Sequence, residues 1–462
     1  MTSKKLLRNG DDYMHCSKEP ELTGRIVTPG DIQYDVDRQD FNTFFNKFPL
    51  VIVYAQETQD VVNAVRWARY RKVPIRIRSG GHSYEAFSLI NAGIVIDVSE
   101  MTKADIDRKH GTVTVQTGIR NLPLYRILGA EGLVVPSGVC PTPGIGGVTL
   151  GGGHSILSRP WGLTLDNLLE LEMVDADGNI IYASDNKNED LFWASRGGGG
   201  GNFGICTSFR FRTHRIDTVG FAEISWDLKD LEPVLRTWQE YTLPSADERL
   251  TPTLFMASGE QTSLLMQGVF LGSEKELSNL LQPLLRAGSP QNVIIKEIPW
   301  VEAAELIAAK QPGTPIPFKS VGPYLYHLLP DKGVNTVEHF MSEAPPNSTV
   351  SVFLHGLGGA VADVPSWATA YPYRKALSNM SLFATWSKPD GAAAGIRWVE
   401  EFRQAMLPFT RGVYVNTPDL SIRNWQNAYY YENFYRLTKV KAKYDPENVF
   451  KFPQSIPPAI YY

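Results

Sequence analysis

The sequence is poor in several features that would narrow its function. Three cysteines in 462 residues are too few for a disulfide framework, and Cys16 and Cys206 are predicted to be free thiols. No apolar stretch approaches the length of a membrane span, and the basic first ten residues lack the apolar core of a signal peptide. A formal net charge of -4 gives no general attraction to nucleic acid or anionic lipid. These absences predict a cytoplasmic protein without nucleic-acid or membrane partners; export by another route and the oligomeric state stay open.

Motifs for several common chemistries are missing as well. The histidines and acidic residues show no spacing typical of a metal site, so no metal is predicted. No Gly-x-Ser-x-Gly elbow and no Walker loop is present. The turn Gly80-Gly81-His82 is not the G-x-G-x-x-G expected after the first strand of a Rossmann fold, which argues against a nicotinamide enzyme.

The chain is longer than one hydrophobic core normally serves, so two domains are expected. As far as about residue 212, the pattern predicts a helix at 40–49, a strand at 50–55, a helix at 58–71 with Thr58 as its N-cap, and a strand at 73–78. Later strands are predicted at 221–226, 253–257, 264–270, 293–298 and 349–354, with helices at 275–286 and 393–407. We expect this second part to be an α+β layer with an antiparallel sheet.

Two turns rich in glycine or proline each carry one potentially nucleophilic side chain. The strand at 73–78 leads into a turn that holds His82, and residues 136–144 hold Cys140. Glycine lets the backbone approach a ligand closely, and successive turn N–H groups suit a pyrophosphate. A histidine ring and a thiol held against a cofactor could each form a covalent bond to it. A simple turn and a buried thiol are the alternative interpretations of these two segments.

Three more blocks occur in order along the chain, at 192–204, 431–446 and 452–456. Together with the two turns they resemble the berberine bridge enzyme-like branch of the vanillyl-alcohol oxidase flavoprotein superfamily. The resemblance implies the two-domain FAD-binding fold of the p-cresol methylhydroxylase type. Residues 1–212 and 413–462 would form the FAD-binding domain, and 213–412 a substrate-binding domain with an antiparallel sheet and helices.

The resemblance also implies FAD joined to the protein twice. His82 would attach at the flavin 8α-methyl group and Cys140 at flavin C6. The other implied FAD-binding residues are Arg78, Ser79, Gly80, Gly81, Ser83, Gly138, Thr142, Pro143, Gly144, Gly146, Gly147, Gly152, Gly153, Gly201, Gly204, Ile205, Tyr414 and Asn416.

The catalytic base is where this sequence departs from the family. Many members take the substrate proton with a tyrosine after Asn in Tyr-x-Asn-Tyr, but here the motif ends in Thr417. A threonine hydroxyl is far less acidic than a phenol, whose pKa is about 10, and cannot act as a base at neutral pH. The candidate catalytic residues are therefore Tyr84, Tyr324, Tyr326 and His355. For each of them a purely structural role is the competing interpretation.

The predicted activity is hydride transfer from a substrate carbon to flavin N5, followed by reoxidation with O2 to give H2O2. Pro143, three residues after the cysteine, stands where the family controls oxygen access, so another electron acceptor stays open. A carbohydrate or similar hydroxylated small molecule is the first substrate class. Oxidation or cyclisation of a phenolic or prenylated compound is the second, because that chemistry needs no strong base. A flavin-loaded binding protein with little turnover is the third alternative.

Overall fold

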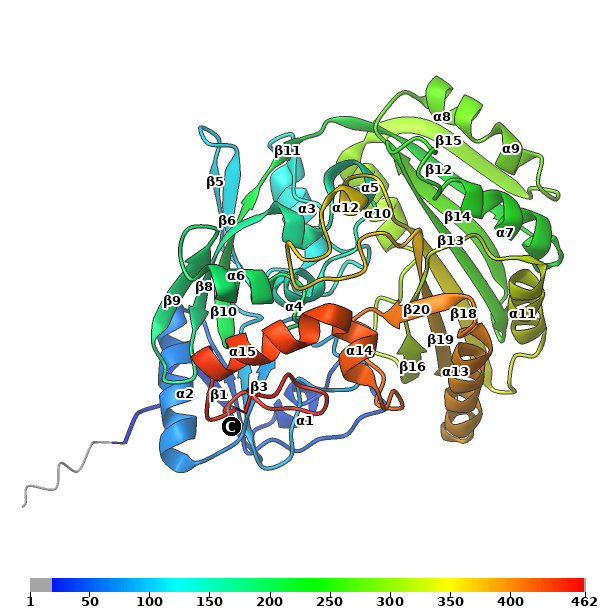
Figure 1. Ribbon diagram of the computed structural model, residues 1–462. Coiled ribbons are helices and arrows are strands. Elements are labelled where there is room, and N and C mark those ends of the chain that lie inside the picture. The colour runs from blue at the N-terminus through cyan, green and yellow to red at the C-terminus, as the bar shows by residue number, and fades with distance from the viewer. Residues whose placement is uncertain (1–18, 461–462) are drawn as a thin grey trace, which may run out of the picture.

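The first part of the chain folds around a small sheet that leads into the first glycine-rich turn. The computed structural model describes residues 19–460. Strands β2 (Val51–Tyr54), β4 (Ile94–Asp97) and β3 (Ile75–Arg78) are parallel, and β1 (Arg25–Val27) pairs antiparallel with β2. Helix α2 (Thr58–Arg71) packs on this sheet through Val61, Val65 and Ala68, which share one face of the helix. Strand β3 therefore carries the chain directly into residues 79–83 (Figure 1).

A second, antiparallel sheet completes this part of the molecule. Its order is β5 (Ala104–Asp107), β6 (Thr112–Gln116), β10 (Ile205–Arg212), β8 (Leu168–Val174) and β9 (Ile180–Ser184). Val174 and Ile205 from this sheet pack into the same core as Val51 and Ile94 of the first sheet. The two sheets therefore form one unit.

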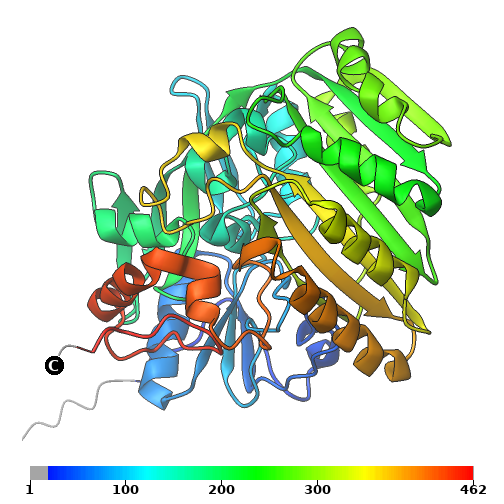
Figure 2. The same ribbon diagram turned by 45° about the vertical axis from the view of Figure 1, so that its right-hand side comes forward.

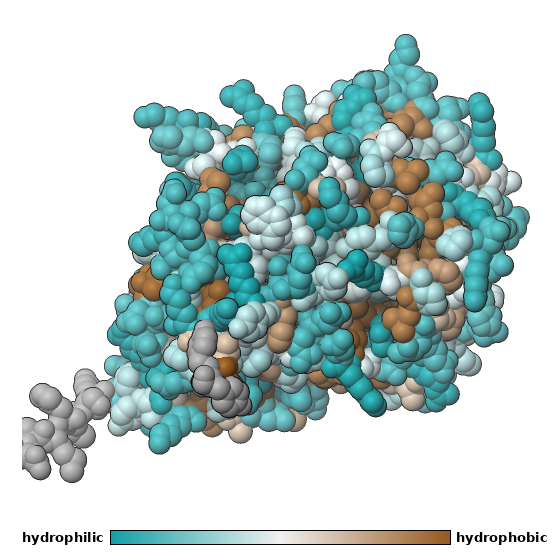
Figure 3. Space-filling view, in the orientation of Figure 1, coloured by the Kyte–Doolittle hydropathy of each residue, from teal (hydrophilic) through white to brown (hydrophobic). Residues whose placement is uncertain are grey.

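A nine-stranded antiparallel sheet builds the middle of the chain. Its order is β15 (Asn292–Pro299), β12 (Thr218–Trp226), β14 (Ser263–Phe270), β13 (Leu250–Gly259), β18 (Ser348–Gly356), β19 (Ser378–Trp386), β17 (Pro323–Leu325) and β20 (Thr410–Val413), and β16 (Phe318–Val321) also pairs with β19. Helices α7 (Leu231–Glu240), α8 (Glu274–Leu280), α11 (Asp331–Ser342) and α13 (Ala392–Met406) lie along its outer face (Figure 2). The opposite, inner face of the sheet lines the cavity described below. In the space-filling view, hydrophobic residues gather at the right, over this sheet and its helices (Figure 3).

The C-terminal segment returns from the large sheet to the first part. After β20 come α14 (Trp425–Tyr430) and α15 (Phe434–Tyr444), and α15 packs against α6 (Glu189–Ser195) (Figure 1). The remaining elements are α1 (Tyr34–Asp37), α3 (Asn121–Gly129), β7 (Leu133–Val134), α4 (Ile145–Gly151), α5 (Ser158–Trp161), η1 (Thr164–Asn167), β11 (His214–Arg215), η2 (Leu228–Asp230), α9 (Gln282–Leu285), α10 (Trp300–Ala308), α12 (Ala360–Asp363), η3 (Pro389–Gly391) and η4 (Tyr431–Asn433). Between residues 19 and 460, no helix is both long enough and apolar enough to cross a bilayer.

The predicted α+β class and antiparallel middle sheet are confirmed, and two local predictions are wrong. Residues 40–49 form no helix, because Asn42 donates to the Tyr84 and Phe318 carbonyls and the backbone there pairs with Ile316 instead. The N-cap of α2 is Glu57, not Thr58, since Glu57 and Asp60 form a capping box. The boundaries between the two domains stay a prediction. Cys206 is a buried free thiol as expected, and Cys16 lies outside the described residues.

Candidate functional site

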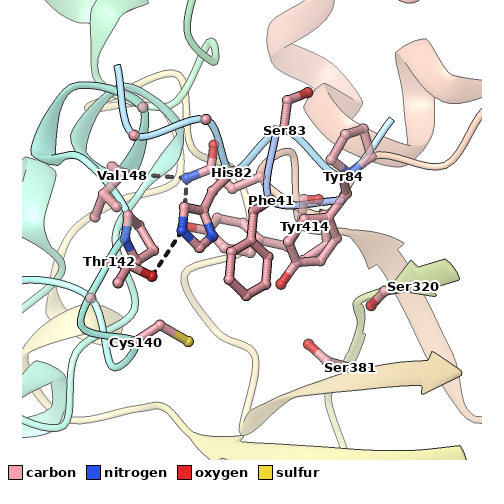
Figure 4. Close-up of a pocket in the computed structure, with 18 of the residues that line it drawn as sticks. Phe41, His82, Ser83, Tyr84, Cys140, Thr142, Val148, Ser320, Ser381 and Tyr414 are labelled. Atoms are coloured by element: carbon pink, nitrogen blue, oxygen red, sulfur yellow. Dashed lines mark hydrogen bonds between the residues drawn. The ribbon is translucent and has the colours of Figure 1, made fainter. Parts of the chain in front are cut away.

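A cavity of about 1030 Å³ lies between the glycine-rich loops and the inner face of the nine-stranded sheet. Residues 79–84, the Cys140 segment and Gly199–Gly201 line one side. Side chains of β13, β14, β18 and β19 line the other side. The volume is at the upper end of the range for ligand sites, which leaves room for a large cofactor together with a small substrate. Figure 4 shows the part of this cavity around His82 and Cys140.

The His82 ring is fixed on two sides. Phe41 stacks on it with ring centroids 4.2 Å apart, and Thr142 Oγ1 lies 2.9 Å from its Nε2 (Figure 4). Burial, with the charge of Arg120 nearby, lowers the pKa of His82 to about 4. The imidazole is therefore neutral near pH 7, which is the nucleophilic form.

The Cys140 thiol lines the same cavity from the loop before α4. Asn121 Nδ2 donates to the Cys140 carbonyl at 2.9 Å, and the Leu122 amide donates to the Pro141 carbonyl, so α3 holds this loop in place. Among the residues that the structure describes, the thiol has one hydrogen bond, a long one of 3.5 Å to Gln311 Oε1. Burial raises its pKa to about 11, so the thiol is protonated at neutral pH.

Glycine brings the two loops together. A Cβ on Gly80 would collide with the backbone nitrogen of Gly144, so only glycine permits this contact. Gly147 in α4 has open space where its Cβ would be and lines the cavity, so its backbone faces the space directly. Such a surface suits the close approach of a dinucleotide, and the residues present therefore fit FAD.

The predicted FAD-binding residues divide into two groups. Arg78, Gly152 and Ile205 do not line the cavity; Arg78 points away from it and forms buried contacts with Asp97 and the Tyr54 hydroxyl. The predicted positions that do line it are Ser79, Gly80, Gly81, His82, Ser83, Gly138, Cys140, Thr142, Pro143, Gly144, Gly146, Gly147, Gly153, Gly201, Gly204, Tyr414 and Asn416. Their roles toward the cofactor stay predictions.

Of the candidate bases, Tyr84 has the most favourable position. Its ring lies edge-on to Phe318 at 4.9 Å and lines the cavity, and its hydroxyl has no hydrogen-bond partner within residues 19–460. Burial raises the pKa of this phenol above its usual value, so the hydroxyl stays protonated and has a proton to donate in a hydrogen bond. Thr417 is not a base, because its hydroxyl donates to the Tyr414 carbonyl at 2.9 Å.

The other three candidates are less accessible. Tyr324 on β17 is fully buried in an aromatic cluster, and Tyr326, just after β17, packs against that cluster; neither side chain lines the cavity. His355 donates from Nε2 to the Ser155 carbonyl at 3.1 Å, and its Nδ1 is enclosed without a partner in the described chain. Burial lowers the pKa of His355 to about 4, which makes it a weak base.

Sequence reasoning missed several residues of the cavity wall. Phe41 supports His82 from a segment predicted to be helical, and His154 lines the cavity next to the glycine segment. Phe255, Phe353 and Phe383 line the sheet side. The phenylalanines alternate with Ser and Thr along their strands, but that pattern also suits any half-buried strand.

Buried ion pairs hold the loops from behind. The Lys441 ammonium is fully buried and donates to the Asp445 carboxylate and the Asn202 carbonyl, each at 2.6 Å. Lys319 pairs with Asp419 at 2.7 Å and with Glu85, next to Tyr84. No cluster of three or more potential metal ligands occurs within residues 19–460.

Comparison with known proteins places this architecture in a family. Residues 49–184 match the FAD binding domain model, and residues 413–457 match the model for berberine and berberine like proteins. An uncharacterized FAD-linked oxidoreductase of Bacillus subtilis, YgaK, is 42% identical, with 96% of this chain and 98% of that protein covered. BBE-like 1 of Physcomitrella patens superimposes with a TM-score of 0.88 at 28% identity, over 95% of this chain and 97% of the other. A xylooligosaccharide oxidase from Myceliophthora thermophila C1, solved with xylobiose, gives 0.85 at 26% identity over 94% and 97%.

Proposed function

Since this chain belongs to the berberine bridge enzyme-like FAD-linked oxidoreductases, we propose that it carries FAD bound covalently at both His82 and Cys140 and oxidises a carbohydrate or a similar hydroxylated compound. Dioxygen is the proposed electron acceptor. The observation that carries this proposal is that one cavity joins the two nucleophilic side chains to a wall of aromatic and hydroxyl side chains.

The two attachment side chains suit their proposed roles. The neutral His82 ring is held between Phe41 and Thr142, so it is ready to form a bond without reorientation. The Cys140 thiol faces the same space and has only a weak contact with Gln311. FAD itself would occupy the glycine-lined side, where Gly80, Gly144 and Gly147 leave the backbone uncovered.

The sheet side of the cavity suits a sugar. Phe255, Phe353 and Phe383 offer flat apolar faces, on which the C–H surface of a pyranose ring can lie. Hydrogen-bonding groups on the same wall come from the polar side chains of Thr349, Ser351, Ser381, Thr385 and Gln267. The xylobiose complex of a structural relative supports the same substrate class for this chain.

When bound, FAD would accept a hydride at N5 from the substrate carbon and pass the electrons on to O2, giving H2O2. The Tyr84 hydroxyl would hold the substrate hydroxyl, because it is the cavity-facing phenol without a partner among residues 19–460. The Phe318 ring, which lies edge-on to Tyr84 at 4.9 Å and lines the cavity, would exclude water beside it.

The attachment is tested by denaturing the purified protein and measuring the flavin that stays with the polypeptide. His82→Ala and Cys140→Ala should each retain flavin through the remaining bond, and only the double variant should release it. Complete release from either single variant would disprove two attachments.

The substrate class is tested by mixing the protein anaerobically with sugars or with phenols and following the loss of flavin absorbance. We expect bleaching by mono- or oligosaccharides, and Tyr84→Phe should slow it at least tenfold, a change of about 1.4 kcal/mol in the barrier. Bleaching by phenols alone would instead favour the second substrate class. An unchanged rate in Tyr84→Phe would remove this residue from the proposal.

A further inference from the structure

A closed trio of polar side chains lies behind the cavity wall. The hydroxyls of Tyr324 and Tyr371 are 2.9 Å apart, and His154 Nε2 lies 3.1 Å from the Tyr371 hydroxyl and 3.5 Å from the Tyr324 hydroxyl. Tyr324 is 0% exposed and Tyr371 is 1% exposed. Neither hydroxyl has another hydrogen-bond partner within residues 19–460.

The proton positions in this trio follow from burial. A buried hydroxyl proton without an acceptor costs about 1–3 kcal/mol, so both phenol protons must be used inside the trio. If Tyr324 donates to Tyr371, the Tyr371 proton goes to Nε2; if Tyr371 donates to Tyr324, the Tyr324 proton goes to Nε2. A proton on Nε2 would instead leave one phenol proton without an acceptor. In both allowed arrangements His154 Nε2 accepts, and the ring proton therefore sits on Nδ1.

Nδ1 is on the open side of the ring. His154 is only partly buried and lines the cavity. Its Nδ1 has no partner in the described part of the chain, and it is not among the enclosed polar atoms there. The ring also stacks on Tyr414 with centroids 4.0 Å apart, which prevents it from turning. Burial and the neighbouring His355 keep the pKa of His154 well below its usual value, so the donor is neutral.

We infer that His154 is a fixed hydrogen-bond donor to the bound flavin and that Tyr371 and Tyr324 are its positioning residues. His154 follows Gly153 directly and stacks on Tyr414, and both are predicted FAD-binding residues that line the cavity. A reduced flavin carries more negative charge than the oxidised form, so a fixed N–H donor stabilises the reduced form more. The trio would thereby raise the reduction potential of the flavin. This inference rests on the proposed function, because it requires FAD in the cavity.

The test is the midpoint potential of the bound flavin, measured on the purified holoprotein without substrate. His154→Phe keeps a ring to stack on Tyr414 but removes the donor. It should shift the two-electron equilibrium at least tenfold toward the oxidised flavin, which is a fall of about 30 mV. His154→Gln, which retains an N–H donor, should recover part of the shift. The double change Tyr324→Phe and Tyr371→Phe should give a smaller fall, because without the two phenol protons nothing requires Nε2 to accept and the ring proton is no longer fixed on Nδ1.

Tyr373→Phe is the matched control. Tyr373 belongs to the same aromatic cluster, but its hydroxyl bonds to the Asn427 carbonyl at 3.1 Å and not to the trio. The midpoint potential of the flavin in Tyr373→Phe should equal that in the unaltered protein. Equal potentials in His154→Phe and the unaltered protein would overturn the inference, and so would a change confined to the KM for substrate. Absence of flavin from the unaltered protein would instead disprove the proposed function.

Discussion

The two walls of the cavity are built in different ways. On the FAD side, the backbone of Gly80, Gly144 and Gly147 forms the surface, and the loops carrying it are fixed by contacts behind them. On the sheet side, alternating side chains such as Phe353 and Ser351 form the surface, and the strand ladder fixes their backbone. A backbone surface suits a constant cofactor, whereas a side-chain surface can change with the substrate without disturbing the fold.

The comparison of the two walls predicts that removing a buried contact behind the FAD wall has the largest effect on stability and flavin content. Lys441→Met removes a fully buried ammonium that joins Asp445 to the loop carbonyl of Asn202. Breaking a buried pair typically costs about 3–5 kcal/mol. The free energy of unfolding should fall by that amount in urea titrations, and the flavin content of the purified protein should fall with it.

Lys443→Met provides the control on the same helix. Lys443 pairs with Asp190 at 2.7 Å, but its side chain is 57% exposed, so less than about 1 kcal/mol is expected. Similar losses of unfolding free energy in Lys441→Met and Lys443→Met would mean that burial does not increase the contribution of the Lys441–Asp445 pair to stability.

Two glycine variants of the same wall should distinguish an effect on packing from an effect on cofactor binding. Gly80→Ala forces a methyl group against the Gly144 backbone, and overpacking of this kind costs about 1–3 kcal/mol. Gly147→Ala meets nothing within 4 Å, so the flavin-free protein should keep its stability while FAD affinity falls. Thermal unfolding of flavin-free protein and FAD titration would measure the two effects separately. Loss of stability in Gly147→Ala would contradict this separation.

The difference between the walls also explains what the sequence could predict. Glycine at a close approach has few alternatives, so the loops around His82 and Cys140 stand out in the sequence, and a family resemblance located them. The sheet side has no such constraint. The pattern of residues 253–257 and 349–354 predicts strands, and the structure has them, but the pattern alone does not reveal which face of each strand meets a cavity.

The positions of other site residues depend on contacts between distant segments, which local sequence patterns do not show. Tyr324 was a candidate base because it alternates with Tyr326, yet the structure buries it behind His154, which comes from a loop 170 residues earlier. Phe41 stacks on His82 because its backbone amide donates to the Gly81 carbonyl, a distant contact that the helical pattern of its segment does not reveal. Arg78 pairs with Asp97 on the neighbouring strand β4 and so leaves the cavity, which a local motif cannot show.

Within the FAD wall, His82 and Cys140, the two proposed attachment side chains, should respond differently to pH. The pKa of His82 lies near 4, so its neutral form prevails above about pH 5 and its bond should form at a constant rate from pH 6 to 9. The pKa of Cys140 lies near 11, so below that value the reactive thiolate increases about tenfold for each pH unit. Reconstitution of flavin-free Cys140→Ala and His82→Ala with FAD isolates each bond. Equal pH profiles for the two variants would refute the difference in protonation.

The smallest effect is expected on the sheet side, where one side chain contributes a single face to the substrate. Phe255 lines the cavity from β13 and makes no ring contact with another aromatic residue of the described chain. Removing one aromatic contact costs about 0.5–1 kcal/mol, so Phe255→Ala should raise the KM for a sugar about twofold to fivefold. Phe255→Tyr keeps the flat ring and should leave KM nearly unchanged. Because this wall does not support the cofactor, flavin content and the unfolding midpoint should stay constant in both variants; a loss of flavin in Phe255→Ala would show that the two walls are not independent.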